Sequence, residues 1–372
     1  SPVCQRTLRR QVQAYVPYTQ RLAILQKFTP SDQEREFSHL VAEYLRRPNL
    51  QAMPEGQRQL ISLVLWKLLA SSSRAIAGAL DTMTKRLQGV LEESTTQDLV
   101  ETLDEDYESL DETAEEWEEE NESNILTADE YQAIADEIEE LKYFKQLAEN
   151  IREDAKSRAL LTALSTAFAK LKELGAKQKA IIFTESKRTQ AYLLECLAQT
   201  DYAGENGDGI VLFNGTNSDP QAQKIYKDWL KRHEGSDKIT DSKTADTRAA
   251  LVEHFKERGT IMIATEAGAE GINLQFCSLI INYDLPWNPQ RIEQRIGRCH
   301  RYGQKHDVVV VNFVDETNEA DQRVYELLEQ KFKLFNGVFG ASDEVLGAIG
   351  SGVDIERRIA EIYRQCRQSE DI

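Results

Sequence analysis

Short apolar runs alternate with helical patterns from residue 154 onward. An uninterrupted run of four to eight apolar residues is typical of a strand that is buried on both faces of a parallel sheet. The predicted strands cover residues 180–183, 210–213, 260–264, 278–283 and 307–313. The predicted helices around them cover residues 155–174, 187–198, 220–232, 244–258, 320–334 and 355–365. This alternation predicts an α/β fold in which helices cover both faces of an open parallel sheet.

The first 150 residues have a different pattern, which predicts a helical region that leans on the sheet. Ser31 and Glu34 have the spacing of a capping box and predict a helix over residues 32–46. Apolar residues at helical spacing predict one long helix or a helix pair over 57–91, and another helix over 128–147. The predicted domains are a helical region at 1–150, a sheet domain at 151–340 and a helical C-terminal extension at 341–372.

The net charge of −18 comes from one segment of the chain. Residues 92–141 contain 22 Asp and Glu and no Lys or Arg, so the rest of the chain carries a net charge of +4. A solvated insertion is the simplest interpretation of such a run. A second interpretation is a surface that recruits a basic partner protein or mimics DNA. The remaining surface can still carry the basic groove of a nucleic-acid-binding protein.

Cysteine and histidine usage indicates neither disulfides nor a metal site. The five cysteines are scattered without a C-x-x-C pair, and the five histidines form no metal-ligand pattern. This usage is typical of a reducing compartment. The chain has no run of about 18 apolar residues and no secretory signal pattern. We therefore expect a cytoplasmic protein with no bound metal of its own and no membrane partner.

Polar and glycine-rich loops follow four of the predicted strands. Ligands of open α/β sheets bind beyond the carboxyl ends of the strands. Thr184, Asn214, Gly215 and Thr265 stand at such positions, where hydroxyls and exposed amides can donate to phosphates. The longest loop reads T-E-A-G-A-E-G-I-N at 265–273, and its glycines allow a ligand to approach the backbone closely.

The block Q-R-I-G-R-C-H-R at 294–301 carries the most specific chemistry. Arg298 and Arg301 are three residues apart on a predicted helix and would project from one face. A planar guanidinium can neutralise charge that builds on a transferring phosphoryl group. Gln294, one turn earlier, could orient the attacking water or the arginine. Each feature alone also has a structural explanation, a solvated face for the arginines and a packed turn for Trp287, so the order of the whole set carries the inference.

Taken together, these motifs resemble those of superfamily 2 helicases. The run at 264–275 is similar to motif V, the block at 294–301 to motif VI, and residues 181–184 to motif IV. The sequences D-L-P-W-N-P at 284–289 and H-R-Y-G-Q at 300–304 are similar to the Swi/Snf-like branch, and within bacteria to RapA-like helicases. The resemblance implies the second, C-terminal RecA-like lobe of an ATP-dependent DNA translocase in the bacterial cytosol or nucleoid.

The resemblance also implies roles for individual residues. Arg298 and Arg301, supported by Gln294, would reach the γ-phosphate of ATP. The residues expected near the nucleotide are Gly268, Glu270, Gly271 and Asn273. The residues expected to hold the tracked nucleic acid are Thr184, Asn214, Gly215, Thr265 and Trp287.

ATP and its Mg²⁺ would be held mainly by another lobe. The chain has neither a G-x-x-x-x-G-K-[ST] loop nor a D-E-x-H-like box. We therefore expect a fragment that is inactive alone, with its own N-terminal ATPase lobe and duplex DNA as partners. Two alternatives are a docking module derived from a helicase lobe and a free-standing α/β enzyme such as a methyltransferase. The intact arginine pattern argues against the first, and the absence of a glycine-rich loop after the first predicted strand argues against the second.

Overall fold

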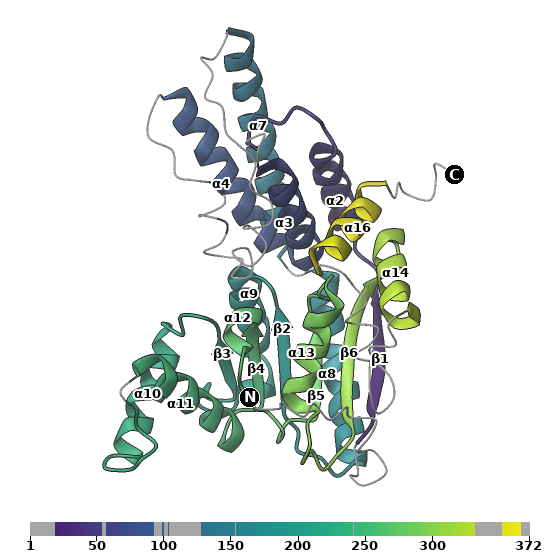
Figure 1. Ribbon diagram of the computed structural model, residues 1–372. Helices are drawn as coiled ribbons and strands as arrows, with labels where there is room; N and C mark the ends of the chain where they lie inside the picture. Colours follow the sequence, from purple (N-terminus) through teal and green to yellow (C-terminus); the bar gives the residue numbers. More distant parts are fainter. Residues whose placement is uncertain are drawn as a thin grey trace, which may run out of the picture.

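The computed structural model describes residues 19–53, 57–92, 99, 103, 128–152, 154–240, 242–331 and 352–365. A sheet and its covering helices form one part of the molecule, and a bundle of helices stands at one end of the sheet (Figure 1). Within the described ranges, no helix is long and apolar enough to cross a membrane.

Six strands form one parallel sheet in the order β1-β6-β5-β2-β4-β3. Their bounds are Arg21–Phe28 for β1, Ala180–Thr184 for β2, Ile210–Phe213 for β3, Ile261–Thr265 for β4, Leu279–Asn282 for β5 and Val308–Asp315 for β6. All five predicted strands are present, with ends displaced by at most about two residues, as is usual for such boundaries. The predicted α/β class is confirmed.

Strand β1 was not predicted, and it corrects the helical interpretation of residues 1–150. It pairs in parallel with β6 over its whole length, from Arg21 opposite Val308 to Phe28 opposite Asp315. Arg21 is only 1% exposed, and its guanidinium donates to both carboxylate oxygens of Glu293 at 2.5 and 2.9 Å. The sheet therefore draws its edge strand from a part of the chain that precedes the predicted domain boundary.

The helices around the sheet begin at side-chain caps. Ser186 accepts from the backbone of Arg188 and Thr189 and starts α9. Asp219 and Asn288 cap α10 and α13, and each is followed by a proline in the first helical position. The bounds are Ala155–Glu173 for α8, Lys187–Ala198 for α9, Pro220–Arg232 for α10, Lys243–Glu257 for α11, Glu266–Ala269 for α12, Pro289–Cys299 for α13 and Glu319–Glu326 for α14. Asp201–Ala203 forms a short 3₁₀ turn, and the π-helical turn Leu327–Lys331 continues α14.

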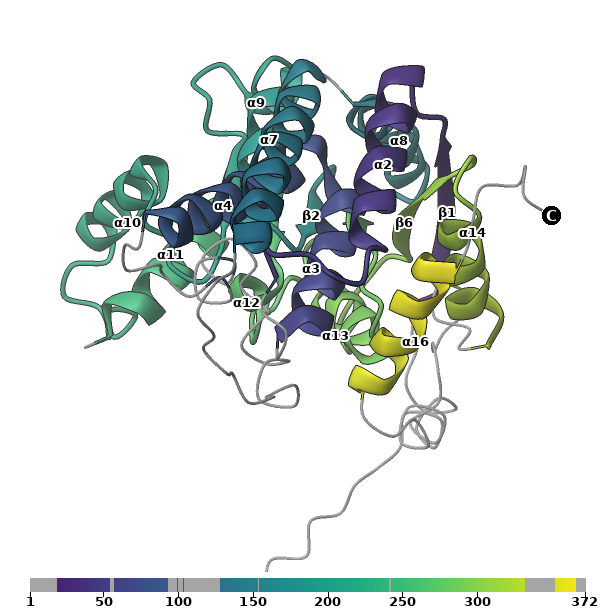
Figure 2. The same cartoon turned by 90° about the horizontal axis from the view of Figure 1, so that it is seen from above.

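Among the described residues, the helical bundle contains α2, α3, α4 and α7 from the first 150 residues and α16 from the C-terminal end (Figure 2). Their bounds are Asp32–Leu45 for α2, Arg58–Ser71 for α3, Ser73–Leu91 for α4, Ala128–Asn150 for α7 and Gly352–Gln365 for α16. The predicted capping box is confirmed, since Ser31 and Glu34 each bond the other's backbone N–H. The region 57–91 is a helix pair, because extended backbone at Ser72 ends α3 and its hydroxyl caps α4.

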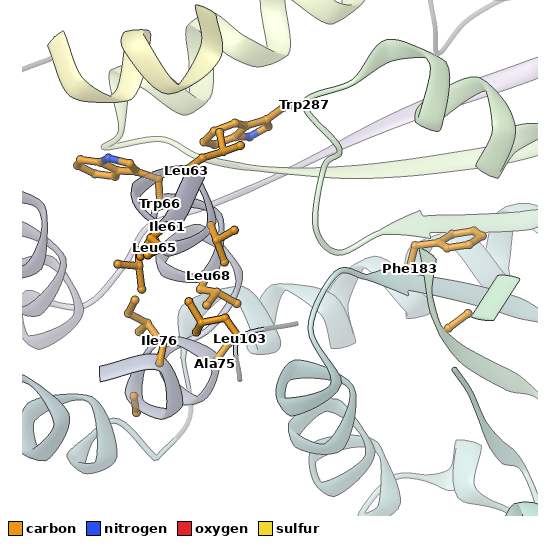
Figure 3. Close-up of a cluster of buried hydrophobic side chains, with 14 of the residues drawn as sticks. Ile61, Leu63, Leu65, Trp66, Leu68, Ala75, Ile76, Leu103, Phe183 and Trp287 are labelled. Carbon is orange, nitrogen blue, oxygen red and sulfur yellow. The ribbon is translucent and has the colours of Figure 1, made fainter. Parts of the chain in front are cut away.

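Two hydrophobic clusters lie on the two faces of the sheet. Alternate residues of β2 point to opposite sides, so Ile181 and Phe183 belong to one cluster and Ala180 and Ile182 to the other. The cluster that contains Phe183 continues into α3 and α4, where side chains such as Leu65 are fully buried (Figure 3). The helical bundle and the sheet domain therefore share one apolar core, which fits the prediction that the helices lean on the sheet.

The later part of the acidic segment has a structural role. Glu137 is buried and accepts from the hydroxyl of Tyr44 at 2.6 Å and from the backbone N–H of Gln51 at 2.7 Å. Glu140 forms a bidentate pair with Arg47, with both N–O distances at 2.6 Å. These contacts fix α7 to α2 and the chain that follows α2. Apart from Leu99 and Leu103, residues 93–127 lie outside the described part.

Candidate nucleotide and nucleic-acid interface

The parallel sheet brings the predicted strand-end residues to one edge. Thr184 and Thr265 are the last residues of β2 and β4 and lie opposite each other in register. Asn214 follows β3, whose last residue Phe213 pairs with β4. Asp284 comes two residues after β5 and lies at the same edge. Four loops that are far apart in the sequence therefore meet where an open α/β sheet binds ligands.

Asp284 is the centre of a buried polar network at this edge. Its Oδ2 accepts from the hydroxyls of Thr184 at 2.6 Å and Ser71 at 2.8 Å, and from the backbone N–H of Glu185 at 3.0 Å. The ammonium of Lys156 lies 3.3 Å from its Oδ1. This network joins the α3–α4 junction to the ends of β2 and β5. The hydroxyl of Thr184 is fully buried within it, so it does not face a ligand in this conformation.

The loop after β3 and the loop after β4 are in direct contact. A Cβ added to Gly268 would lie 2.5 Å from Cα of Asn214 and 2.8 Å from the carbonyl oxygen of Phe213, so only glycine fits there. The side-chain amide of Asn214 donates to Gln190 at 2.9 Å, and Gly215 is exposed. The exposed nucleic-acid candidate at this edge is thus the Asn214–Gly215 turn, because Thr265 is fully buried.

Helix α13 is anchored at this edge by Arg295, which is 1% exposed. Its Nε donates to Glu266 at 2.6 Å, and its Nη1 donates to the carbonyl oxygen of Asp284 at 2.6 Å. Glu185 lies 3.8 Å from its Nη2, and its guanidinium carbon lies 5.0 Å from the ring centre of Phe183. The sequence analysis did not assign this role to Arg295. Arg295 lies four residues after Arg291, so helical spacing places both side chains on the same face of α13.

The other arginines of the block have no such partners. Helix α13 ends at Cys299, so Arg298 lies in its last turn, whereas Arg301 follows the cap residue His300 and is not on the helix. Arg298 is half-buried, and Arg301 and Gln294 are exposed. Among the described residues, neither guanidinium has an ion pair or hydrogen-bond partner. Burial lowers the pKa of Arg298, and the charge of nearby Glu266 opposes that shift.

The loop after β4 is fixed against the end of α13. The backbone N–H of Leu274 donates to the carbonyl oxygen of Arg298 at 2.9 Å. Gly271 has φ of +75°, which a side chain would strain, and Glu270 and Asn273 are exposed beside it. The loop that carries the candidate nucleotide residues therefore contacts the last turn of α13, which contains Arg298, and the role of these residues stays a prediction.

His300 and Gln304 of the H-R-Y-G-Q run have structural roles that the sequence analysis did not assign. His300 accepts from Nε of Arg21 at 3.3 Å, and its other ring nitrogen lies 2.7 Å from the carbonyl oxygen of Thr19. Gln304 donates to the carbonyl oxygens of Cys277 and Cys299 at 3.1 and 3.2 Å. These bonds tie the turn that carries Arg301 to β1 and to the start of β5.

Trp287 requires a correction, because it is not on the surface. Its ring is 4% exposed and stacks on Tyr363 of α16, with ring centres 4.8 Å apart and planes at 18°. Tyr363 also contacts Trp66 of α3 at 6.1 Å, and Figure 3 shows Trp66 and Trp287 on the same side of the α3 cluster. A buried aromatic ring in a three-ring contact cannot press on a duplex without first leaving that contact. The packed-turn interpretation describes this conformation.

Comparison with known proteins defines the class of the domain. Residues 156–303 match the helicase conserved C-terminal domain. This part of the chain is therefore similar to the C-terminal domain of helicases, and it has the α/β fold described above. Within the described residues, no group of three His, Cys, Asp or Glu is placed to hold a metal ion.

Two relatives and one solved structure are similar to parts of the chain. The uncharacterized ATP-dependent helicase YqhH of Bacillus subtilis is 40% identical over 171 residues, which is 46% of this chain and 25% of that protein. The RNA polymerase-associated protein RapA of Serratia proteamaculans is 40% identical over 76 residues, 20% of this chain and 8% of that protein. The crystal structure of the C-terminal part of the Fun30 ATPase domain has a TM-score of 0.45 at 13% identity and covers 93% of this chain and 98% of that chain. The chain thus spans a quarter or less of the two curated relatives.

Proposed function

We propose that this chain is the second lobe of a nucleic-acid-dependent ATPase of the Swi/Snf-like class, which translocates on duplex DNA. In the whole protein, Arg298 and Arg301 would contact the γ-phosphate of ATP that is held by a first lobe. The proposal rests on the helicase C-terminal domain and on relatives that carry the names of an ATP-dependent helicase and of RapA.

The observation that carries this proposal is the free state of the two arginines. Arg295, on the same helix, has anionic and carbonyl partners within 2.6 Å. Arg298 is half-buried beside it without an ion-pair or hydrogen-bond partner among the described residues, and a half-buried guanidinium whose N–H groups have no acceptor costs free energy. A phosphate that arrives between Arg298 and Arg301 would offset that cost and accept bidentate hydrogen bonds. The donor set on this chain therefore fits the phosphates of ATP, whereas a Mg²⁺ site is not expected on it.

The other candidate residues would orient the attacking water, contact the nucleotide or bind the nucleic-acid strand. Gln294 is exposed one turn before Arg298 and would orient the water that attacks the γ-phosphate. Residues 268–273 would line the ribose side of the nucleotide. The Asn214–Gly215 turn would hold the backbone of the tracked strand through its exposed polar groups. The hydrogen bond from Leu274 to Arg298 would couple nucleotide contact to this edge of the sheet.

The test is ATP hydrolysis by the intact protein, with the upstream lobe present, with and without duplex DNA. Arg298→Ala and Arg301→Ala should each lower DNA-stimulated turnover by about 10³-fold or more, the range found for arginine fingers. Arg258→Ala is the matched control, because Arg258 is also exposed but lies at the end of α11. Unchanged turnover in both finger variants would refute the motor assignment and favour a docking module.

A further inference from the structure

A groove of about 480 Å³ opens at the edge of the sheet opposite the strand-end site. It lies where β2, β5 and β6 begin, whereas Thr184 and Asn214 stand where strands end. At about 3.3 Å per residue, the five residues of β2 separate the two edges by roughly 16 Å. The groove is lined by Lys177, Val252, Lys256, Asn273, Gln275, Phe276, Gly303, Gln304, Lys305 and His306.

All the charged residues of this lining are basic. Lys177, Lys256 and Lys305 are exposed, and no Asp or Glu lines the groove. Within the described part of the chain, none of these three lysines forms an ion pair. Some exposed lysines elsewhere do so, since Lys142 and Lys170 have carboxylate oxygens at 2.7 and 2.8 Å. The three groove lysines differ from other exposed lysines in that they surround one opening that no carboxylate lines.

The walls of the groove are held by a fixed set of hydrogen bonds. Gln304 is buried, and its side-chain oxygen accepts from the backbone N–H groups of Lys305 and His306 at 2.9 and 3.2 Å. Gln275 donates to the carbonyl oxygen of Tyr302 at 2.7 Å, and Gly303 turns the chain with φ of +95°. The ring of His306 lies 3.0 Å from the carbonyl oxygen of Leu174, and Lys179 donates to the carbonyl oxygen of Phe255 at 2.7 Å. These contacts join the three segments that carry the lysines, so their charges surround one preformed opening.

We propose that this groove is a second contact site for the phosphate backbone of nucleic acid. Lysines act as point charges that suit sequence-blind phosphate contact, and the side-chain amide of Gln275 adds a donor for phosphate or sugar oxygens. A protein partner fits less well, because three exposed lysines surround the groove and lysine is depleted at protein interfaces. Lys305 comes four residues after Arg301, so the site extends the basic end of α13 away from the strand-end edge. The inference rests on the proposed function and adds a second nucleic-acid contact to it.

The test is the salt dependence of duplex binding by this chain, measured by fluorescence anisotropy with a labelled 20-base-pair DNA. The variant Lys177→Gln/Lys256→Gln/Lys305→Gln should reduce the slope of log K against log salt by about 2.7, at about 0.9 per lost phosphate contact. Its affinity at 0.1 M salt should fall roughly tenfold or more. The three side chains are exposed, so the melting temperature should not change.

The matched control is Lys85→Gln/Lys142→Gln/Lys170→Gln, which removes the same charge from exposed lysines that are ion-paired elsewhere. An equal loss of slope in both variants would show that only net charge matters and would overturn the proposal. A groove variant with an unchanged slope would do the same. Calorimetry with inorganic tripolyphosphate distinguishes the DNA backbone from free oligophosphates as the ligand. The unaltered chain could bind tripolyphosphate tightly while the groove variant loses that binding but still binds DNA normally. This outcome would assign the groove to free oligophosphates and overturn the nucleic-acid proposal. If the unaltered chain shows no salt-dependent duplex binding at all, the proposed function itself fails.

Discussion

Helix α13 and the turn after it use arginine in opposite ways. Arg295, within the helix, lies against the sheet, is 1% exposed and is paired with Glu266. Arg298 in the last turn and Arg301 beyond the helix have no ion-pair or hydrogen-bond partner among the described residues and are half-buried or exposed. Arg295 therefore fixes the helix to the strand ends, whereas the other two guanidinium groups are available to a ligand. Local pairing, rather than residue type, separates a structural arginine from a candidate catalytic one.

The largest effect should come from removing the paired arginine. Arg295→Ala leaves Glu266 without its ion pair and the carbonyl oxygen of Asp284 without its donor. Breaking a buried pair in this way costs about 3–5 kcal/mol of unfolding free energy. Urea denaturation measures it, and the effect of Arg298→Ala on the same scale should stay within about 0.5 kcal/mol. Equal stability losses in Arg295→Ala and Arg298→Ala would remove the distinction between the paired and the unpaired arginine.

Asp284→Asn tests whether the helical bundle is held at the strand ends by charge. Asn keeps the size of the side chain but gives Lys156, which is 8% exposed, no carboxylate partner. We expect a loss of about 2–3 kcal/mol in unfolding free energy, the range for a hydrogen bond to a charged group. Ser71→Ala, which removes one neutral donor to the same carboxylate, should cost about 1 kcal/mol. A smaller effect for Asp284→Asn than for Ser71→Ala would contradict the charged network.

The two motif glycines allow the same comparison between a packed position and an open one. Gly268→Ala would place Cβ 2.5 Å from Cα of Asn214, and relieving this overlap should cost about 1–3 kcal/mol. Gly297 lies within α13, and a Cβ there meets no atom within 4 Å. Gly297→Ala should therefore stabilise the protein by about 0.5–1 kcal/mol. Thermal melting of both variants decides the point, and a stabilised Gly268→Ala protein would refute the close contact of the two loops.

The sheet could be predicted from sequence wherever its strands were continuous apolar runs. Strand β1 escaped because its apolar core, Leu22–Leu25, is flanked by Arg21 and by Gln26 and Lys27, and four residues cannot be assigned to strand or helix by periodicity. Its partner β6 lies almost 300 residues later, and such long-range pairing leaves no local signal. The capping box needed only Ser31 and Glu34, three residues apart, and was therefore predicted correctly.

The meeting of the strand-end loops was predictable from the sequence, but the exposure of their side chains was not. The strand-end loops do meet, because a parallel register dictates it. Whether Thr184 and Trp287 face solvent depended on α3 and α16, which cover them through Ser71 and Tyr363. The position of Arg301 beyond the helix depended on where α13 ends, which side-chain spacing did not determine. The burial of side chains by helices from other parts of the chain, and the residue at which α13 ends, are therefore the features that the sequence did not predict.

Asp315 is the acidic counterpart of Arg298, a partly buried charge with no ion pair among the described residues, and its effect on stability should depend on pH. Burial raises its pKa to about 6, although the hydroxyl and backbone N–H of Thr317 donate to it. A raised folded pKa means that the folded state binds the proton more tightly, so stability from this group increases as pH falls through about 6 and is complete below the unfolded value near 3.8. Between pH 7.5 and 5.0 this gain is about 1.4 kcal/mol, at about 1.36 kcal/mol per pKa difference of one.

Asp315→Asn should remove that gain, so the variant is the more stable protein at pH 7.5 and its advantage shrinks by about this amount at pH 5.0. Urea denaturation at both pH values measures the difference, with Asp237→Asn as an exposed control that should stay within about 0.5 kcal/mol of the unaltered protein at each pH. If the stability advantage of Asp315→Asn did not change with pH, the pKa of Asp315 would be the same in the folded and unfolded states. The lower stability of the unaltered protein would then come from the shape of the side chain and not from its charge.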